Sequence, residues 1–246
     1  MGLFGFERRN PKIHRPPQER AAQPEPAAAK PSAAQLVAQG KRYYEAGDRA
    51  KAKECFAAAD QDVQARFWLG RLYEEDTSDA RNAQEAFFWY RRAAEQGDAE
   101  AQYKVGWCFA SGFGVAVDYA QAAAWYRKAA QQGHAVCQCN LGQLCEKGVG
   151  VPRSYTDAVR WYRAAAEQGD PVAQFHLGDC YENGRGVKAS RTDAIRWYRA
   201  AGQSGHSEAC TRLGRLLADG SEDEVPHYET SAGENASSES GSDKAA

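Results

Sequence analysis

The sequence is poor in the features that mark membrane, secreted and nucleic-acid-binding proteins. Its 246 residues include only seven cysteines, which is too few for a disulfide-dense secreted scaffold. Mean hydropathy is −0.71, and no apolar run approaches the roughly 18 residues that a membrane-spanning helix needs. The 31 Lys and Arg residues nearly cancel the 33 Asp and Glu residues, and the net charge of −2 argues against general binding to polyanions.

Both ends of the chain lack the apolar residues that a folded core requires. Six of the nine prolines lie in the first 31 residues, where six basic residues outnumber three acidic ones. The segment from Ser221 onward is rich in Ser, Gly and Glu, and it holds seven acidic residues against one Lys. We therefore predict a disordered Pro-rich leader over residues 1–32 and a disordered acidic tail over residues 221–246.

The first residues do not have the order of a secretory signal. An apolar stretch, Met1–Phe6, comes before the charged residues Glu7, Arg8 and Arg9, whereas a signal peptide places its positive charge first. Phe6 also stands where a myristoylation motif has Ser or Thr. We expect a cytoplasmic protein with reduced thiols. A short docking motif or a weak membrane anchor in Met1–Phe6 is the alternative.

What the sequence has in abundance is a regular repeat. Four Trp-Tyr pairs recur every 36 residues, beginning at Trp89, Trp125, Trp161 and Trp197. Two glycine columns and one alanine column share this spacing: Gly70, Gly106, Gly142, Gly178 and Gly214; Gly97, Gly133, Gly169 and Gly205; and Ala86, Ala122, Ala158 and Ala194. Several independent columns with one period predict an array of helical hairpins.

Each period contains the signals of two helices and a turn. In residues 98–133, a first helix is predicted over residues 99–111, with Gly112 as its C-terminal stop. Asp118 is predicted to cap a second helix, and the equivalent caps are Asn82, Ser154 and Ser190. The glycine column that includes Gly142 falls inside a helix, where Gly costs about 1 kcal/mol relative to Ala, so we expect a Trp-Tyr pair to approach it closely.

These motifs resemble Sel1-like repeats, which are relatives of the tetratricopeptide repeat. The match is nearly complete in the Ala-Gln-Phe-His-Leu-Gly-Asp-Cys-Tyr run of residues 173–181, the Gly-Arg-Gly-Val turn of residues 184–187 and the Trp-Tyr-Arg-Ala-Ala run of residues 197–201. The resemblance implies an all-α fold, a right-handed α-solenoid of antiparallel helix-turn-helix hairpins with a 36-residue period. It covers about residues 62–220, as four repeats plus a terminal half-repeat, and residues 33–61 are expected to form a tetratricopeptide-like capping hairpin.

Two patterns could carry chemistry but also have structural interpretations. The Gly-x-Gly-Val turns lack the preceding strand of a phosphate-binding loop, so we interpret them as hairpin turns. The cluster His134, Cys137, Cys139 and Cys145 could bind zinc or act in redox chemistry. Packing is the favoured interpretation, because Cys137 and Cys139 point to different helix faces and the cysteines replace small apolar residues of the repeat. No catalytic constellation accompanies the five histidines, so we predict no enzyme activity, no cofactor and no metal.

A basic column follows the Trp-Tyr pairs, at Arg91, Arg127, Arg163 and Arg199. It could form a ladder for phosphates or nucleic acid. However, Glu95 and Glu167 lie four residues after Arg91 and Arg163, which favours a solvated helix face with internal ion pairs. We therefore predict no nucleic-acid binding.

The binding surface is expected on the first helices, which line the concave side of such solenoids. Positions that vary between repeats are the informative ones there, and two tryptophans, Trp68 and Trp107, fall outside the Trp-Tyr column. The predicted partner-binding residues share one helix face and are Trp68, Arg71, Lys104, Trp107, Gln143, His176, Asp179, Arg212 and Arg215.

The resemblance and this face together predict a non-catalytic adaptor. It is expected to hold a partner protein or peptide in a concave groove, as a monomer without stable membrane insertion. The resemblance alone implies a bacterial setting in signalling, envelope or secretion-linked assembly. The alternative is an autoregulated module whose acidic tail folds back over Arg212, Arg215 and the basic column. A hydrolase or a metal-binding protein is the third possibility and has no motif to support it.

Overall fold

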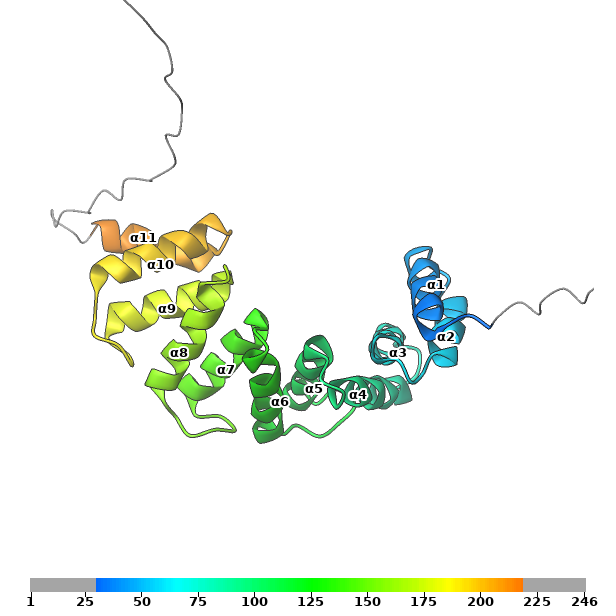
Figure 1. The fold of residues 1–246 in the computed structure, drawn as a ribbon. Helices are drawn as coiled ribbons and strands as arrows, with labels where there is room; N and C mark the ends of the chain where they lie inside the picture. Colours follow the sequence, from blue (N-terminus) through cyan, green and yellow to red (C-terminus); the bar gives the residue numbers. More distant parts are fainter. Residues whose placement is uncertain (1–29, 219–246) are drawn as a thin grey trace, which may run out of the picture.

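Eleven α-helices account for most of residues 30–218, the part of the chain that the computed structural model describes (Figure 1). They are α1 (Ala33–Glu45), α2 (Arg49–Ala58), α3 (Val63–Glu75), α4 (Arg81–Ala94), α5 (Ala99–Ser111), α6 (Tyr119–Gln131), α7 (Ala135–Lys147), α8 (Tyr155–Ala166), α9 (Pro171–Asn183), α10 (Arg191–Gln203) and α11 (Ser207–Ala218). No strand occurs within this range. The expected all-α solenoid of hairpins with a 36-residue period is confirmed. The expected acidic tail, and all but residues 30–32 of the expected leader, lie outside the described residues.

Helix boundaries follow the predicted capping residues in most repeats. Helix α5 spans the predicted residues 99–111 and ends at Gly112, whose φ of 78° is left-handed. The Asp118 carboxylate accepts hydrogen bonds from the first turn of α6, and Ser154 and Ser190 do the same for α8 and α10. These short polar side chains satisfy helix N–H groups that would otherwise lack partners.

The prediction that Asn82 caps the second helix of its hairpin is wrong. Helix α4 begins at Arg81, two residues earlier than a cap at Asn82 would place it, and the Asn82 side chain instead donates to the Asp76 carbonyl oxygen at 3.0 Å. The physical reason is the loop before α4, which lacks the Gly-x-Gly-Val turn of the other repeats. In this loop the Asp79 carboxylate accepts from the Arg81 backbone N–H at 2.9 Å and takes the place of the cap.

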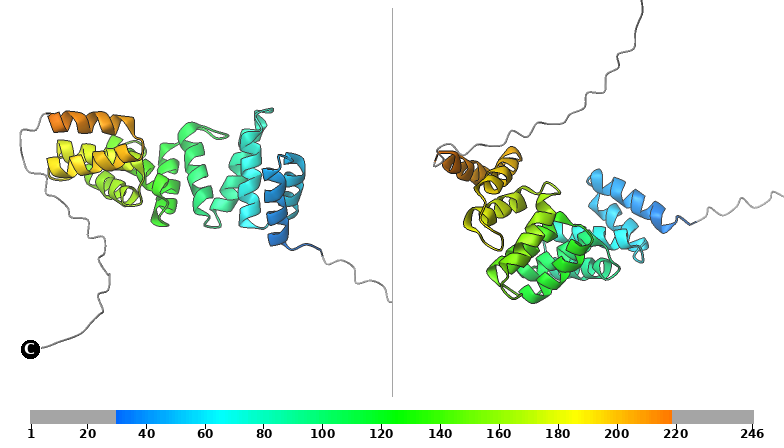
Figure 2. Two further views of the ribbon diagram at one scale, coloured as in Figure 1. Left: turned by 90° about the horizontal axis from the view of Figure 1, so that it is seen from above. Right: turned by 60° about the vertical axis from the view of Figure 1, so that its left-hand side comes forward.

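The helices stack in sequence order into an open arc. Each helix packs against the next along the chain, from α1 and α2 to α10 and α11. Helices α3, α5 and α7 lie on the inner side of the arc, and α4, α6 and α8 lie on the outer side (Figure 1). The two further views in Figure 2 show the same stacking from above and from one side. The described chain therefore presents a concave face formed by the first helix of each hairpin.

The helical glycines give room for an aromatic ring of the next helix. A Cβ atom on Gly142 would lie 2.7 Å from Cδ1 of Tyr162, and the other repeats have the same contact. The expected close approach is therefore present, and the ring involved is the Tyr of the Trp-Tyr pair. The four tyrosines of this column are 0–4 % exposed, whereas Trp125 alone among the four tryptophans is buried, at 8 %.

A buried glutamine column joins successive hairpins. The amide nitrogens of Gln102, Gln138 and Gln174 donate to carbonyl oxygens at the end of the preceding helix, at 3.2, 3.0 and 3.2 Å. The side-chain oxygens of Gln102 and Gln138 accept from the side chains of Gln132 and Gln168, which lie just after α6 and α8. The side-chain oxygen of Gln174 has no hydrogen-bond partner among the described residues. Residue 204, the equivalent of Gln132 and Gln168, is the shorter Ser204.

The cysteines mostly fill the core. Cys108, Cys137, Cys139, Cys145 and Cys180 are buried, Cys55 is partly buried and Cys210 is exposed, and all seven are free thiols. Burial raises the pKa of Cys108, Cys139 and Cys180 to about 12, which keeps these thiols protonated and unreactive. Among residues 30–218, no group of three or more His, Cys, Asp and Glu side chains is arranged to hold a metal ion. Over the same residues, no helix combines the length and apolar character needed to cross a bilayer.

Candidate functional site: the concave face

A repeated contact between a tyrosine, a glutamate and a basic side chain runs along the first helices. The Tyr of a Trp-Tyr pair donates its hydroxyl hydrogen to the Glu four residues after the helical glycine, and the next hairpin places a basic side chain (Lys, His or Arg) near that Glu. We call this series the concave ladder; its steps are Tyr90–Glu74–Lys104, Tyr162–Glu146–His176 and Tyr198–Glu182–Arg212.

The distances in the ladder are those of hydrogen bonds and ion pairs. Tyr162 Oη lies 2.7 Å from Glu146 Oε2, and Tyr198 Oη lies 2.6 Å from Glu182 Oε2. Lys104 Nζ lies 2.9 Å from both oxygens of Glu74. Burial, followed by the hydrogen bond to Glu146, raises the pKa of Tyr162, so its hydroxyl remains a donor at all physiological pH values. Each step ties one hairpin to the next.

The ladder is interrupted in its second step. Ala110 stands where the other repeats have Glu, and Asn140 stands where they have Lys, His or Arg. Tyr126 therefore has no carboxylate partner among the described residues. Burial raises the pKa of Tyr126, and its contact with the Asn140 side chain acts in the opposite direction. Because the acid and the cation are both missing, α5 and α7 present an uncharged step between charged ones.

Three predicted site residues border this interruption. Trp107 is partly exposed, and its ring lies 5.1 Å from the Phe113 ring between centroids. Lys104 Nζ lies 5.6 Å from the centroid of the Trp107 ring, which is within cation–π range. Gln143 is also partly exposed, and its Nε2 lies 3.3 Å from His176 Nε2. An aromatic side chain, an ammonium group and a primary amide thus lie on neighbouring helices at the centre of the concave face.

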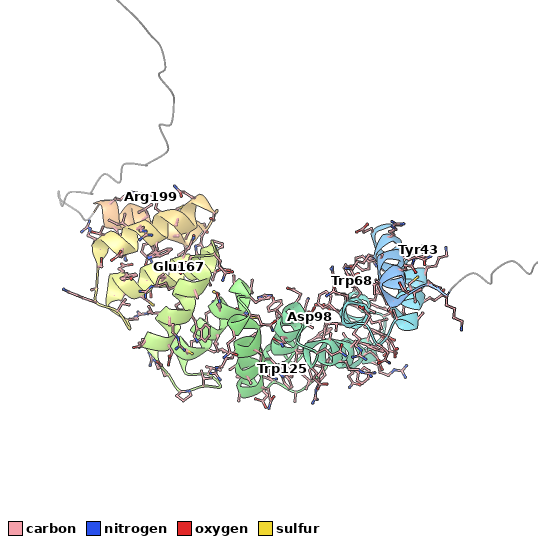
Figure 3. The ribbon with its side chains drawn as sticks, viewed as in Figure 1. Tyr43, Trp68, Asp98, Trp125, Glu167 and Arg199 are labelled. Carbon is pink, nitrogen blue, oxygen red and sulfur yellow. The ribbon has the colours of Figure 1, made fainter. Side chains whose placement is uncertain are left out.

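Trp68 and Arg71 belong to a separate cluster at the first hairpin. The Trp68 ring meets the Tyr44 ring edge-on at 4.8 Å and stacks on Phe56 at 5.9 Å. Arg71 lies 4.7 Å from the Trp68 ring and donates to Tyr44 Oη at 3.1 Å. Figure 3 places Trp68 on the inner side of the arc and Trp125 on the outer side. These contacts give Trp68 a packing role between α1, α2 and α3, in addition to its partly exposed position.

The last three predicted residues form an ion-pair network on α9 and α11. Arg212 lies 3.7 Å from Asp179 Oδ1 and 3.6 Å from Glu182 Oε2. Arg185 lies 3.1 Å from Asp179 Oδ2, and Arg215 pairs with Glu182. The positive charges at this end of the concave face are therefore already opposed by carboxylates of the same chain.

His176 links the centre of the face to this network. Its ring stacks on the Tyr162 ring with a centroid distance of 4.9 Å and an angle of 8° between planes. Its Nδ1 lies 3.9 Å from Glu146 Oε2. Burial lowers the pKa of His176 below its ordinary value of 6.5, although Glu146 and Asp179 act against this. The neutral imidazole is thus the favoured form at neutral pH.

The structure thus distributes the nine predicted residues over three clusters rather than one continuous strip. Sequence reasoning missed the acidic members of the ladder: Glu74, Glu146 and Glu182. Their signal was available, because they recur at the 36-residue period or twice that period. A hollow of about 320 Å³ between α2 and α3 is lined by Arg49, Lys53, Tyr73 and Glu75, among others, and contains none of the predicted residues.

The basic column of the second helices is exposed, as expected for a solvated face. Arg91 Nε lies 2.9 Å from Glu95 Oε1, which confirms that predicted ion pair. The predicted pair between Arg163 and Glu167 is wrong: Arg163 Nη2 donates to Tyr181 Oη at 2.8 Å. Because the phenol of the following hairpin is in reach, the guanidinium turns toward it rather than along its own helix.

Comparison with known proteins identifies the repeats. The Sel1 repeat model matches residues 63–98, 99–134, 135–170, 171–206 and 207–227. No curated protein shows a significant match to the chain. The fold resembles a Sel1 repeat protein from Oxalobacter formigenes, with 34 % identity, a TM-score of 0.69, and coverage of 75 % of this chain and 74 % of that one.

A second solved structure is similar over part of its length. A protective antigen present in uropathogenic Escherichia coli strains, described as displaying an SLR fold, is 33 % identical with a TM-score of 0.73. The match covers 76 % of this chain but only 41 % of the antigen, so the chain spans about two fifths of that protein. Because five consecutive matches cover most of the sequence, the chain belongs to the Sel1 repeat family.

Proposed function

We propose that this Sel1 repeat protein is a non-catalytic scaffold that binds a partner protein or peptide on its concave face. The observation that carries the proposal is the interruption of the concave ladder at Ala110 and Asn140. Among the other predicted residues of the face, Arg71, Lys104, Asp179, Arg212 and Arg215 form ion pairs within the chain. Here Trp107 and Gln143 border an uncharged step, and neither side chain forms an ion pair within the described residues. Lys104 lies beside Trp107 and pairs with Glu74.

The chemistry of this central region favours a peptide. A partly exposed Trp supplies the kind of aromatic contact that dominates many interfaces. The primary amides of Gln143 and Asn140 have donors and acceptors suited to a peptide backbone. Trp68 with Arg71, and His176 with Asp179, Arg212 and Arg215, would form the ends of the contact area. A partner that reaches these residues must contact side chains that are already held by ion pairs and ring contacts within the chain.

The setting is part of the proposal. It includes a bacterial signalling, envelope or secretion-linked assembly, a monomeric state and a cytoplasmic location. The bacterial setting is supported by the similar proteins from Oxalobacter formigenes and Escherichia coli. Absence of catalysis is proposed because the thiols of Cys108, Cys139 and Cys180 are buried and protonated and because the neutral His176 is engaged by Tyr162 and Gln143.

The alternative, in which the acidic tail of residues 221–246 competes for the concave face, has weaker support. It would rely on Arg212 and Arg215, but both already pair with Glu182. An acidic tail would have to displace carboxylates that are 14–15 % exposed and held by several contacts. The expected effect of deleting residues 221–246 on partner affinity is therefore small.

The test uses a displayed library of random 12-residue peptides selected against the full chain. Binding of a selected peptide is then measured by calorimetry to the wild type, to Trp107→Ala and to Phe88→Ala. Phe88 is a matched control, because it is a 47 % exposed aromatic residue on α4, away from the first helices. Trp107→Ala is expected to weaken binding at least about tenfold, as for an interface anchor, and Phe88→Ala is expected to leave it unchanged. Equal affinities for all three proteins would overturn the proposal.

A further inference from the structure

Each of the six first helices has a glycine at the same position, and an aromatic ring of the following helix packs against five of these glycines. A Cβ atom at these five glycines would lie 2.5–2.8 Å from a ring carbon of the following helix; the pairs are Gly40–Phe56, Gly70–Tyr90, Gly106–Tyr126, Gly142–Tyr162 and Gly178–Tyr198. Gly214 on α11 is the sixth. Within residues 30–218, no atom lies within 4 Å of the corresponding Cβ position. We call the space over each of these glycines a socket. The socket at Gly214 is not filled by any described residue.

The rest of this helix face is incomplete in the same way. Leu213 is equivalent to Leu69, Leu141 and Leu177, which are 0–1 % exposed, yet Leu213 is only partly buried. Leu217, one turn after Leu213, is 48 % exposed. Together with the exposed Cys210, these residues form what we call the α11 end face: Cys210, Leu213, Gly214 and Leu217. A terminal repeat that only needed to end the solenoid would carry polar residues here.

The chain that follows α11 does not carry the residues that fill the other sockets. In the four Sel1 hairpins the ring residue comes 20 positions after the glycine, with alanines four positions before and three after the ring, as in Ala194, Tyr198 and Ala201. The corresponding positions after Gly214 are Thr230, Glu234 and Ser237. A charged side chain at position 234 cannot replace a buried ring.

We propose that the α11 end face is a docking site for an amphipathic helix of another protein, which presents an aromatic side chain to Gly214. The expected helix has the pattern Ala-x-x-x-aromatic-x-x-Ala, because this interface continues the one between the two helices of every hairpin. Docking of one helix against an apolar helix face is an established mode of peptide recognition. This site lies at one end of the solenoid, and it is independent of the function proposed for the concave face.

The surroundings of Gly214 also favour one type of aromatic residue in the partner. In three repeats the Tyr hydroxyl donates to a Glu four residues after the glycine, but position 218 is Ala. A phenol at Gly214 would therefore lack that acceptor, and Phe56 already fills the Gly40 socket without a hydroxyl. The partner's residue is expected to be Phe rather than Tyr, since an unpaired buried hydroxyl is costly.

The probe is a stapled helical peptide with the sequence of residues 191–203 and Phe in place of Tyr198; the control peptide has Ala at that position. Stapling is needed because an isolated helix of this length is marginal in water. The readout is the rate at which iodoacetamide alkylates Cys210 in the full chain, followed by mass spectrometry. Cys210 lies one turn before Gly214 and is the exposed cysteine among the described residues.

At about ten times its Kd, the Phe peptide is expected to slow alkylation of Cys210 roughly tenfold, because the rate follows the unbound fraction. The Ala peptide should give no protection, and a Gly214→Leu chain should show no protection by either peptide. Equal protection by both peptides, or none by either, would overturn the proposal. Faster alkylation of Cys210 in Tyr228→Ala than in the wild type would also overturn it, because the tail would then occupy the socket. Slower alkylation at higher chain concentration would overturn it as well, because a second copy would then occupy the socket.

Discussion

The hydroxyl of Tyr162 on α8 donates to the carboxylate of Glu146 on α7, with 2.7 Å between the oxygens. The Tyr162 ring also covers Gly142, which lies on α7 as well. One side chain therefore fills the core of its hairpin and fixes a charged group on the concave face. The next hairpin adds His176, whose ring stacks on the Tyr162 ring. Packing and surface chemistry of the repeat are thus set by the same tyrosine.

Removing this hydroxyl tests the energetic weight of the concave ladder. Tyr162→Phe should lower the free energy of unfolding by about 1.5 kcal/mol, the low end for a hydrogen bond to a charged group. Tyr126→Phe is the matched control, because Ala110 leaves Tyr126 without a Glu partner, and it should cost about 0.5 kcal/mol. Urea denaturation measures both. Equal losses for the two variants would show that the carboxylate contributes nothing.

The helical glycines predict substitutions of opposite sign. Gly142→Ala places a Cβ atom 2.7 Å from the Tyr162 ring, which is held by its own hydrogen bond and cannot easily shift. We expect this overpacking to destabilise the chain by about 1–3 kcal/mol. Gly214→Ala meets no described atom and should stabilise it by about 0.5–1 kcal/mol through helix propensity. Thermal unfolding followed by circular dichroism distinguishes the signs; a gain at Gly142 would contradict the packing described above.

The unpaired oxygen of Gln174 predicts a stabilising change. In Ser204→Gln, the new side chain has the position from which Gln132 and Gln168 donate to Gln102 and Gln138. The expected gain is about 1 kcal/mol, because a buried acceptor without a partner costs roughly that amount or more. Ser204→Ala is the control and should not stabilise the chain. A Gln variant no more stable than the Ala variant would mean that water already satisfies Gln174.

The stability of the chain should depend on His176 below neutral pH. Burial lowers the pKa of His176 in the folded state, so below about pH 6.5 the unfolded chain binds a proton that the folded chain does not. This contribution is present above the unfolded pKa and is lost as the pH falls from about 6.5 toward the lowered folded value. His176→Asn, which copies Asn140 of the preceding hairpin, should flatten the curve of unfolding free energy in this range. Parallel curves for the two proteins would contradict the assignment.

The fold was predictable because its determinants are periodic. Helix limits such as residues 99–111 follow from apolar spacing, a glycine stop and an Asp cap, all of which act locally. The failure at Asn82 arose where the first Sel1 repeat lacks its Gly-x-Gly-Val turn, so that a local loop of Asp76 and Asp79 decides where α4 begins. A repeat pattern cannot specify a position that departs from it.

The concave face was predictable only in part, because its contacts join different repeats. The columns of Lys104, His176 and Arg212 were visible in the sequence, but their partners Glu74, Glu146 and Glu182 lie about 30 residues upstream. The spacing identifies the face and does not say which charge each side chain meets. For the same reason the packing of Trp68 on Phe56 and Tyr44, which belong to the hairpin of α1 and α2, was not foreseen.

The most direct test of the central claim is hydrogen–deuterium exchange of the full chain with and without a peptide selected for binding. If the concave face binds the peptide, amides of α5 and α7, residues 99–111 and 135–147, become protected around Trp107 and Gln143. Amides of α4 and α6, on the outer side of the arc, should exchange as before (Figure 1). Protection confined to α4, α6 and α8, with α5 and α7 unchanged, would contradict the account.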